Sequence, residues 1–162
     1  MNKKQKEMYD LLTERAEVAL VVCGSGALYA RGLSDKKPGD LDMCLTELSL
    51  HKIDKVMEEI GGKLVLDNPH AFGFTVRKQY SVDGEKYDFF TVGTMFNDFD
   101  FIEGIPYVNE NIVWAARGFY AAMGSKKYQQ QLVDQGYWTD LGGKKKFNLI
   151  GKIKWVVRNL LK

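Results

Sequence analysis

A strand-like apolar run that ends in a glycine-rich turn is the feature that most limits the folds open to this sequence. Residues 18–23, Val-Ala-Leu-Val-Val-Cys, contain no polar side chain before Cys23, and Gly24-Ser25-Gly26 follows at once. A short apolar run without polar alternation is typical of a strand that is covered on both faces. Residues 27–33 then have the length of a short helix that begins at the turn. The pattern predicts a sheet flanked by helices.

The other segments extend this prediction over the whole chain. Asp83-Gly84, between two aromatic and β-branched runs, predicts a hairpin turn. Residues 94–110 show neither the periodicity of a helix nor the alternation of a strand. We predict an α+β (mixed α/β) fold with a core over residues 1–110 and a C-terminal helical segment over residues 111–162, packed on the same domain. The expected strands are 18–23, 40–46, 63–66, 72–82 and 85–92, and the expected helices are 4–16, 27–33, 49–60 (with Ser49 as N-cap), 111–123, 126–135 and 147–161.

Composition excludes several classes of protein. Apolar residues make up 45% and charged residues 27% of the 162 residues, as in a soluble globular protein. No apolar run approaches the roughly 18 residues of a membrane-spanning helix. The polar N-terminus has no apolar segment of a secretory signal behind it, so we expect a cytoplasmic protein with Cys23 and Cys44 reduced and buried. With only two cysteines and two histidines in the chain, we do not expect a structural zinc site.

Two aspartates in the second strand are the first candidates for chemistry. In the sequence Asp40-Leu41-Asp42-Met43, strand alternation places both carboxylates on one face and both apolar side chains on the other. Neighbouring like charges are unfavourable unless a cation compensates them. Oxygen ligands without histidine or thiolate favour Mg²⁺ or Mn²⁺. Carboxylate pairs that hold such ions are a common device for displacement at phosphorus.

The glycine-rich turn and a third acidic residue complete the candidate site. The glycines of Gly24-Ser25-Gly26 let the backbone come close to a ligand, and amides at a helix start favour a phosphate. Asp88, flanked by aromatic residues inside a predicted strand, is the best third carboxylate. Residues that would replace it if the strand register differs are Asp83, Glu85, Asp98 and Asp100.

These residues together resemble the polymerase-β-like nucleotidyltransferase superfamily. Its pattern is an apolar strand, Gly-Gly or Gly-Ser, a spacer, Asp-hydrophobic-Asp-hydrophobic, and an acidic residue on a later strand. Here the pattern is formed by Gly24-Ser25, by Asp40-Leu41-Asp42-Met43 and by Asp88, with 14 residues between Ser25 and Asp40. The resemblance covers about residues 18–92. It implies a central mixed sheet followed by a helical segment.

The resemblance also implies a reaction and roles for the residues. A nucleoside monophosphate would pass from an NTP to an acceptor hydroxyl, with release of pyrophosphate and with Mg²⁺ or Mn²⁺ as cofactor. Asp40, Asp42 and Asp88 would bind metal and act in catalysis, while Gly24 and Ser25 would bind the nucleotide's phosphates. Further candidates to neutralise phosphate are Arg77, Lys78, Lys126 and Lys127.

The acceptor stays open between RNA, such as tRNA, and a small molecule such as an antibiotic. Residues 144–162 carry seven basic side chains and no acidic one, whereas the rest of the chain holds 16 basic and 21 acidic ones. Such a basic segment is either a solvated helix face or a nucleic-acid contact. Pairing into a homodimer is one way for so small a chain to complete an acceptor site. Two alternatives to a nucleotidyltransferase are a catalytically inactive binding or antitoxin-like module of the same fold and an Asp-x-Asp glycosyltransferase.

Overall fold

The computed structural model of the chain describes residues 1–71, 75–91, 98–136, 138–141 and 144–147. The chain divides into two compact units, Met1–Glu110 and Asn111–Lys162. Within the described ranges, no helix combines the length and the apolar character needed to cross a membrane.

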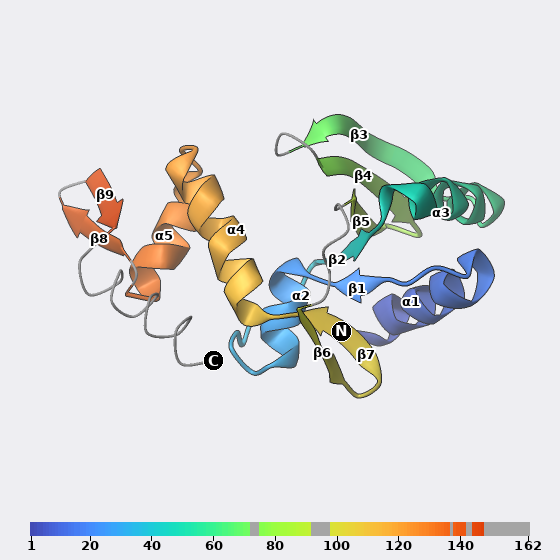
Figure 1. Ribbon diagram of the computed structural model, residues 1–162, viewed down its shortest axis with the longest axis horizontal. Coiled ribbons are helices and arrows are strands. Elements are labelled where there is room, and N and C mark those ends of the chain that lie inside the picture. The colour runs from blue at the N-terminus through green and yellow to red at the C-terminus, as the bar shows by residue number, and fades with distance from the viewer. Residues whose placement is uncertain (72–74, 92–97, 137, 142–143, 148–162) are drawn as a thin grey trace. The chain divides into compact units, whose positions relative to one another are not determined.

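A mixed sheet of seven strands is the framework of the first unit (Figure 1). Its strand order is β3-β4-β5-β2-β1-β7-β6. The pairs β2–β5 and β1–β7 are parallel, and the other neighbouring pairs are antiparallel. The predicted mixed sheet with flanking helices is therefore confirmed. Its strands are β1 (Val21–Val22), β2 (Asp40–Leu45), β3 (Lys63–Ala71), β4 (Thr75–Val82), β5 (Glu85–Thr91), β6 (Phe99–Ile102) and β7 (Ile105–Val108).

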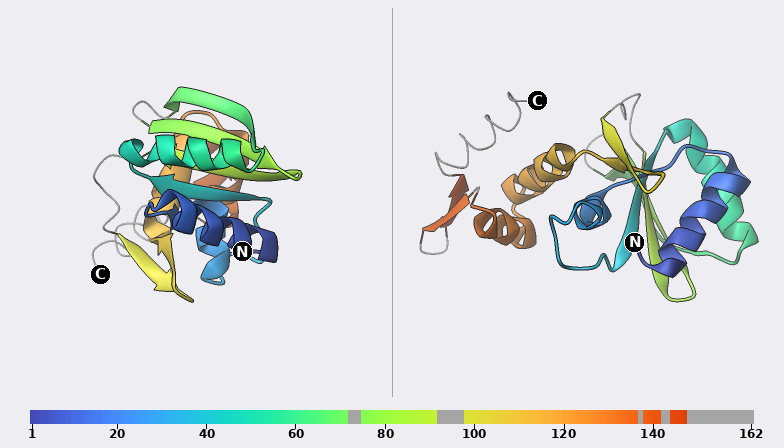
Figure 2. Two further views of the ribbon diagram at one scale, coloured as in Figure 1. Left: turned by 90° about the vertical axis from the view of Figure 1, so that its right-hand side faces the viewer. Right: turned by 90° about the horizontal axis from the view of Figure 1, so that it is seen from below.

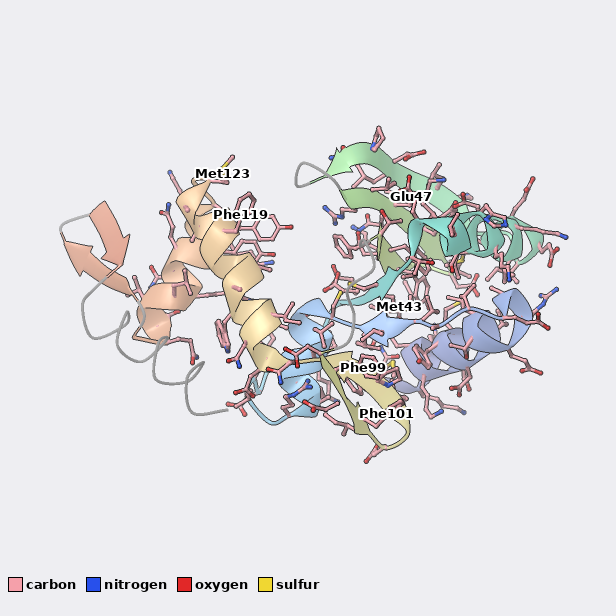
Figure 3. All side chains as sticks on the ribbon, in the orientation of Figure 1. Met43, Glu47, Phe99, Phe101, Phe119 and Met123 are labelled. Carbon is pink, nitrogen blue, oxygen red and sulfur yellow. The ribbon has the colours of Figure 1, made fainter. Side chains whose placement is uncertain are left out.

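Three helices cover the two faces of this sheet unequally. Helices α1 (Lys3–Ala16) and α3 (Glu47–Glu59) lie together on one face, and the short helix α2 (Gly24–Ala30) lies on the other (Figure 2). The apolar positions of β2 point into the layer under α1 and α3, where Leu41, Met43 and Leu45 are at most 3% exposed (Figure 3 labels Met43). The alternation in β2 therefore turns Asp40 and Asp42 toward the face that carries α2.

The hairpin of β4 and β5 follows the predicted turn. Asp83 and Gly84 both have positive φ, 49° and 82°, which a two-residue hairpin turn of the Asp-Gly kind requires. The turn sets the register so that Gln79 lies opposite Asp88. Residues 72–74, at the start of the predicted strand, lie outside the described residues.

Several predicted boundaries are wrong. Helix α2 begins at Gly24 itself, because Gly24 adopts a left-handed φ of 58° and the chain turns there. Helix α3 has Thr46 as its N-cap, and Ser49 lies inside the first turn, where its hydroxyl is 2.8 Å from that of Thr46. Residues 94–110, which match no pattern, include the hairpin of β6 and β7, with its turn at Glu103 and Gly104.

The second unit contains two helices and a small hairpin. Helices α4 (Glu110–Ala122) and α5 (Lys126–Asp134) agree with the prediction, and the stacked rings of Tyr120 and Tyr128 connect them at 5.1 Å. Strands β8 (Trp138–Leu141) and β9 (Lys144–Phe147) pair antiparallel and were not anticipated. The predicted helix 147–161 lies outside the described residues, apart from Phe147 at the end of β9.

Candidate active site

The parallel pairing of β2 with β5 brings three carboxylates together. Asp42 lies directly opposite Asp88 in this register, and Asp40 lies two residues earlier on the same face of β2. One ligand oxygen of each residue can be chosen so that all three lie within 4.8 Å of one another. Asp40 and Asp42 are half-buried, whereas Asp88 is 0% exposed. The structure thus assembles a compact acidic cluster from two strands that are far apart in sequence.

Strand β4 supplies the partners of the buried carboxylate. The Arg77 Nε atom donates to Asp88 Oδ1 at 2.7 Å, and the Gln79 Nε2 atom donates to Asp88 Oδ2 at 2.6 Å. The Arg77 guanidinium also lies 5.5 Å from the centre of the Phe90 ring. A buried charge needs such partners, because the loss of hydration is otherwise uncompensated.

The electrostatics of Asp42 reveal an excess of negative charge in the cluster. Burial first, and then the charges of Asp40 and Asp88, raise the pKa of Asp42 from its ordinary value of 3.8 to about 7. The positive charge of Arg77 and a hydrogen bond from the backbone amide of Ser25 oppose this shift without cancelling it. One guanidinium therefore does not balance three carboxylates.

The donor set fits a hard divalent cation. Every candidate ligand is a carboxylate oxygen, and Mg²⁺ and Mn²⁺ prefer oxygen ligands. A cation held by Asp40, Asp42 and Asp88 would offset the mutual repulsion of the three carboxylates, which together with burial raises the pKa of Asp42. Within the residues that the structure describes, this is the cluster in which three such side chains come together.

The glycine-rich turn packs directly against the cluster. An ideal Cβ atom at Gly24 would overlap the carboxylate of Asp42, so that glycine permits the approach of β2 to the start of α2. The backbone amide of Cys23 donates to the carbonyl oxygen of Asp42 at 2.9 Å. Ser25 follows in the first turn of α2 and is half-buried. Predicted nucleotide-binding residues and predicted metal ligands are therefore neighbours.

Both cysteines lie close to this turn as free thiols, as the sequence predicts. A hydrogen bond with Cys44, together with burial, raises the pKa of the Cys23 thiol well above its ordinary value. Cys44 is buried, but Cys23 is only half-buried, in contrast to the expectation. Both thiols are expected to be poor nucleophiles.

The structure does not bring Lys78 to the cluster. Its side chain leaves β4 on the opposite face from Arg77, where its Nζ atom lies 2.7 Å from Asp54 Oδ2 of helix α3 and 3.9 Å from Asp67 Oδ2. The period of two along a strand explains the difference between these adjacent residues. The candidate role of Lys78 in nucleotide binding is therefore not supported by its position.

The remaining candidates are two lysines of the second unit and four acidic residues of the first. Lys126 and Lys127 begin α5 in the second unit, and the Nζ atom of Lys127 lies 5.3 Å from the centre of the Tyr128 ring. Of the alternatives to Asp88, Asp83 occupies the hairpin turn, and Asp100 pairs with Arg31 at 2.8 Å. Glu85 begins β5, and Asp98 is exposed.

Gln79 belongs to the site but was not among the residues predicted from the sequence. A neutral amide side chain in a strand is not by itself a signal of a functional site. Counting back from the Asp83-Gly84 turn would have found it, because a two-residue turn pairs Val82 with Glu85 and hence Gln79 with Asp88.

Comparison with known proteins identifies the fold. No protein-family model matches the sequence, and no curated protein matches it. The solution structure of the antibiotic-resistance factor ANT(2'')-Ia matches with a TM-score of 0.59 and 14% identity, over 78% of this chain and 76% of that one. A putative nucleotidyltransferase from Thermotoga maritima, TM1012, matches with a TM-score of 0.56 and 14% identity, over 83% and 96%.

A third solved structure extends the comparison. The lincosamide antibiotic adenylyltransferase LnuA, in its lincomycin-bound form, matches with a TM-score of 0.53 and 13% identity, over 71% of this chain and 85% of that one. ANT(2'')-Ia has also been crystallised with adenylyl-2''-tobramycin. The chain has the fold of these solved nucleotidyltransferase structures, and the fold that the sequence resemblance implies is therefore confirmed.

Proposed function

We propose that the protein is a metal-dependent nucleotidyltransferase that moves a nucleoside monophosphate from an NTP to an acceptor hydroxyl. The observation that carries the proposal is the cluster of Asp40, Asp42 and Asp88, whose ligand oxygens lie within 4.8 Å of one another beside the turn at Gly24 and Ser25. The same fold with its acidic side chains far apart would not support metal-dependent nucleotidyl transfer. The cluster argues against an inactive module that has lost its ligands.

In the proposed reaction, the acceptor oxygen bonds to the α-phosphorus as the bond from that phosphorus to the bridging oxygen breaks. Pyrophosphate leaves with the electron pair, and the proton of the acceptor hydroxyl passes to Asp88 or through it to solvent. Asp40, Asp42 and Asp88 would hold a divalent cation, which would supply positive charge to the phosphates and to the leaving group. Because little covalent work falls to the protein, positioning and electrostatics provide most of the rate enhancement.

Each residue of the site then has a defined task. Asp40, Asp42 and Asp88 would hold the cation, and Asp88 also orients and deprotonates the acceptor. The Ser25 hydroxyl donates to a phosphate oxygen at the start of α2, next to the contact between Gly24 and Asp42. Arg77 limits the negative charge of the cluster.

A small molecule is the acceptor class that we favour. Solved structures with the same fold include a lincomycin-bound adenylyltransferase and a protein crystallised with adenylyl-2''-tobramycin. The basic residues at 144–162 keep RNA as the second candidate. The label-transfer assay described below distinguishes these two acceptor classes.

Transfer of label from each of the four NTPs, labelled at the α-phosphate, tests the proposal. The reactions contain Mg²⁺ or Mn²⁺ and either a panel of aminoglycosides and lincosamides or total RNA. We expect label on one acceptor class, and none with the Asp40→Ala, Asp42→Ala double variant, whose fold is checked by circular dichroism. NTP binding without transfer to any acceptor would favour the inactive module, and labelling from UDP-sugars alone would favour a glycosyltransferase.

A further inference from the structure

The buried carboxylate of Asp88 is held on both oxygen atoms by one neighbouring strand. Arg77 donates to Oδ1 at 2.7 Å and Gln79 donates to Oδ2 at 2.6 Å. A carboxylate has about four lone-pair sites, so these two donors leave about two sites for other partners. The two hydrogen bonds together set the plane of the carboxyl group, which a single bond would leave free to rotate.

The three strands place Gln79, Asp88 and Asp42 in one row across the sheet. Gln79 is the register partner of Asp88 in the antiparallel pair β4–β5, and Asp42 is its partner in the parallel pair β2–β5. Gln79 therefore contacts Asp88 from the side away from Asp42. The free lone pairs of Asp88 remain available on the side where the other carboxylates lie.

The two donors differ in what they do to the charge. Arg77 is cationic, and its positive charge opposes the negative charge of the cluster. Gln79 is neutral, so it holds the carboxylate without neutralising it. A hydrogen bond from a neutral donor orients a carboxylate and leaves its negative charge available to a bound cation.

We propose that Gln79 is a positioning residue, which holds Asp88 in the orientation that lets it bind a divalent cation and receive the acceptor's proton. The proposal rests on the function proposed above. Gln79 itself contacts neither substrate nor cation and acts through Asp88. Loss of its amide leaves the NTP's binding groups intact but lets the Asp88 carboxyl group rotate.

Two isosteric variants test this role. Gln79→Met removes the donor, and Gln79→Glu keeps the polarity but offers an acceptor and a like charge in its place. Both variants are expected to lower kcat with the identified acceptor by on the order of 10–100-fold and to leave the KM for the NTP unchanged. The decrease in kcat is expected to be at least as large for Gln79→Glu as for Gln79→Met. Binding of Mn²⁺ alone, followed by electron paramagnetic resonance, weakens by a similar factor and requires no acceptor.

A matched control lies next to Gln79 on the same strand. Tyr80→Phe also removes one hydrogen bond from β4, from the Tyr80 hydroxyl to Asp54 Oδ1 at 2.6 Å, but on the opposite face of the sheet. It is expected to lower Tm while leaving kcat and Mn²⁺ affinity at native values. If Tyr80→Phe lowers kcat and Mn²⁺ affinity as much as Gln79→Met does, the effect is a general loss of strand stability and the proposal fails.

The native protein and the Asp88→Asn variant together separate failure of this proposal from failure of the proposed function. Absence of transfer by the native protein to any acceptor would overturn the proposed function itself, and native turnover of Asp88→Asn would overturn the role proposed for Asp88. If Asp88→Asn abolishes turnover while both Gln79 variants keep native kcat and Mn²⁺ affinity, only the positioning role is wrong. In the Asp88→Asn background, Gln79→Met is expected to change the residual rate and the Mn²⁺ affinity by less than about twofold, because the group that it positions is already altered.

Discussion

The Oδ2 atom of Asp42 occupies the space that a side chain at Gly24 would need. A Cβ atom at that position would overlap this oxygen, and the backbone of Gly24 also has a φ of 58°, which side chains rarely tolerate. Glycine at position 24 therefore serves two purposes: it turns the chain into α2, and it lets a carboxylate of the cluster lie against the turn.

Gly24→Ala is expected to damage both stability and transfer. The left-handed backbone alone costs about 1–2 kcal/mol for alanine, and the overlap forces Asp42 to move. A displacement of about 1 Å in such a site lowers the rate by on the order of 100-fold. Urea unfolding and label transfer measure the two effects.

The neighbouring loop offers a control for this substitution. Gly39 precedes Asp40, has an ordinary φ and has open space where a Cβ atom would lie. Gly39→Ala is expected to change stability by less than about 0.5 kcal/mol and to leave transfer intact. Equal damage from both substitutions would show that the contact between Gly24 and Asp42 has no special importance.

The raised pKa of Asp42 predicts a dependence of stability on pH in metal-free protein. The folded state binds this proton with a pKa of about 7, and the unfolded state with an ordinary value of 3.8. Ionisation of Asp42 therefore disfavours folding, and its contribution to the free energy of unfolding decreases as the pH rises from about 4 to about 7. Relative to native protein, Asp42→Asn becomes more stable across this window by on the order of 2–4 kcal/mol.

Urea unfolding in EDTA at several pH values between 4 and 8 measures this difference. Saturating Mg²⁺ is expected to reduce it, because a bound cation stabilises the ionised carboxylate and competes with the proton. A constant difference between native protein and Asp42→Asn over the whole range would mean that Asp42 has an ordinary pKa in the folded state.

Arg77→Met is expected to destabilise the metal-free protein strongly. The substitution leaves the wholly buried Asp88 without its charged partner, and breaking a pair of this kind costs roughly 3 kcal/mol or more. Removing the acidic partner as well, in Arg77→Met with Asp88→Asn, restores part of that loss. Thermal unfolding in EDTA compares the three variants, and a double variant that is as unstable as the sum of its parts would contradict the pairing.

Lys78→Met is expected to lower the stability of the protein without changing the KM for the NTP. Its ammonium group pairs with Asp54 of α3, and Asp54 also accepts a hydrogen bond from Tyr80. Loss of one partner of a half-buried pair costs about 1–2 kcal/mol. The KM for the NTP, measured by label transfer, stays at its native value. A KM raised tenfold, with stability unchanged, would return Lys78 to the nucleotide site.

Local patterns in the sequence were sufficient for several parts of the site. Strand alternation places Asp40 and Asp42 on one face and Met43 in the core, because side chains of a strand alternate whatever its neighbours are. The Asp83-Gly84 turn likewise determines the pairing of β4 with β5. Both depend on residues that are close in the chain, so the sequence expresses them directly.

The boundaries of the strands and the strands at the edge of the sheet were harder to predict from the sequence. Strand β1 comprises only two residues of a longer apolar run. The hairpin of β6 and β7 lies in a segment whose sequence shows neither a helical nor a strand periodicity. Strand β7 belongs to the sheet because it pairs with β1, which precedes it by more than 80 residues. Such pairing depends on packing and hydrogen bonding with distant partners, which local propensity does not encode.

The sequence by itself determined that two aspartates alternate with apolar residues in one strand, and that a glycine-rich turn precedes them. Only the tertiary structure decided that Asp42 meets Asp88 and that Lys78 pairs with Asp54 of helix α3. The physical reason is that the parallel pair β2–β5 joins segments separated by helix α3 and two strands. Its register follows from how the whole sheet packs its core, and one residue of slippage would turn Asp88 to the opposite face.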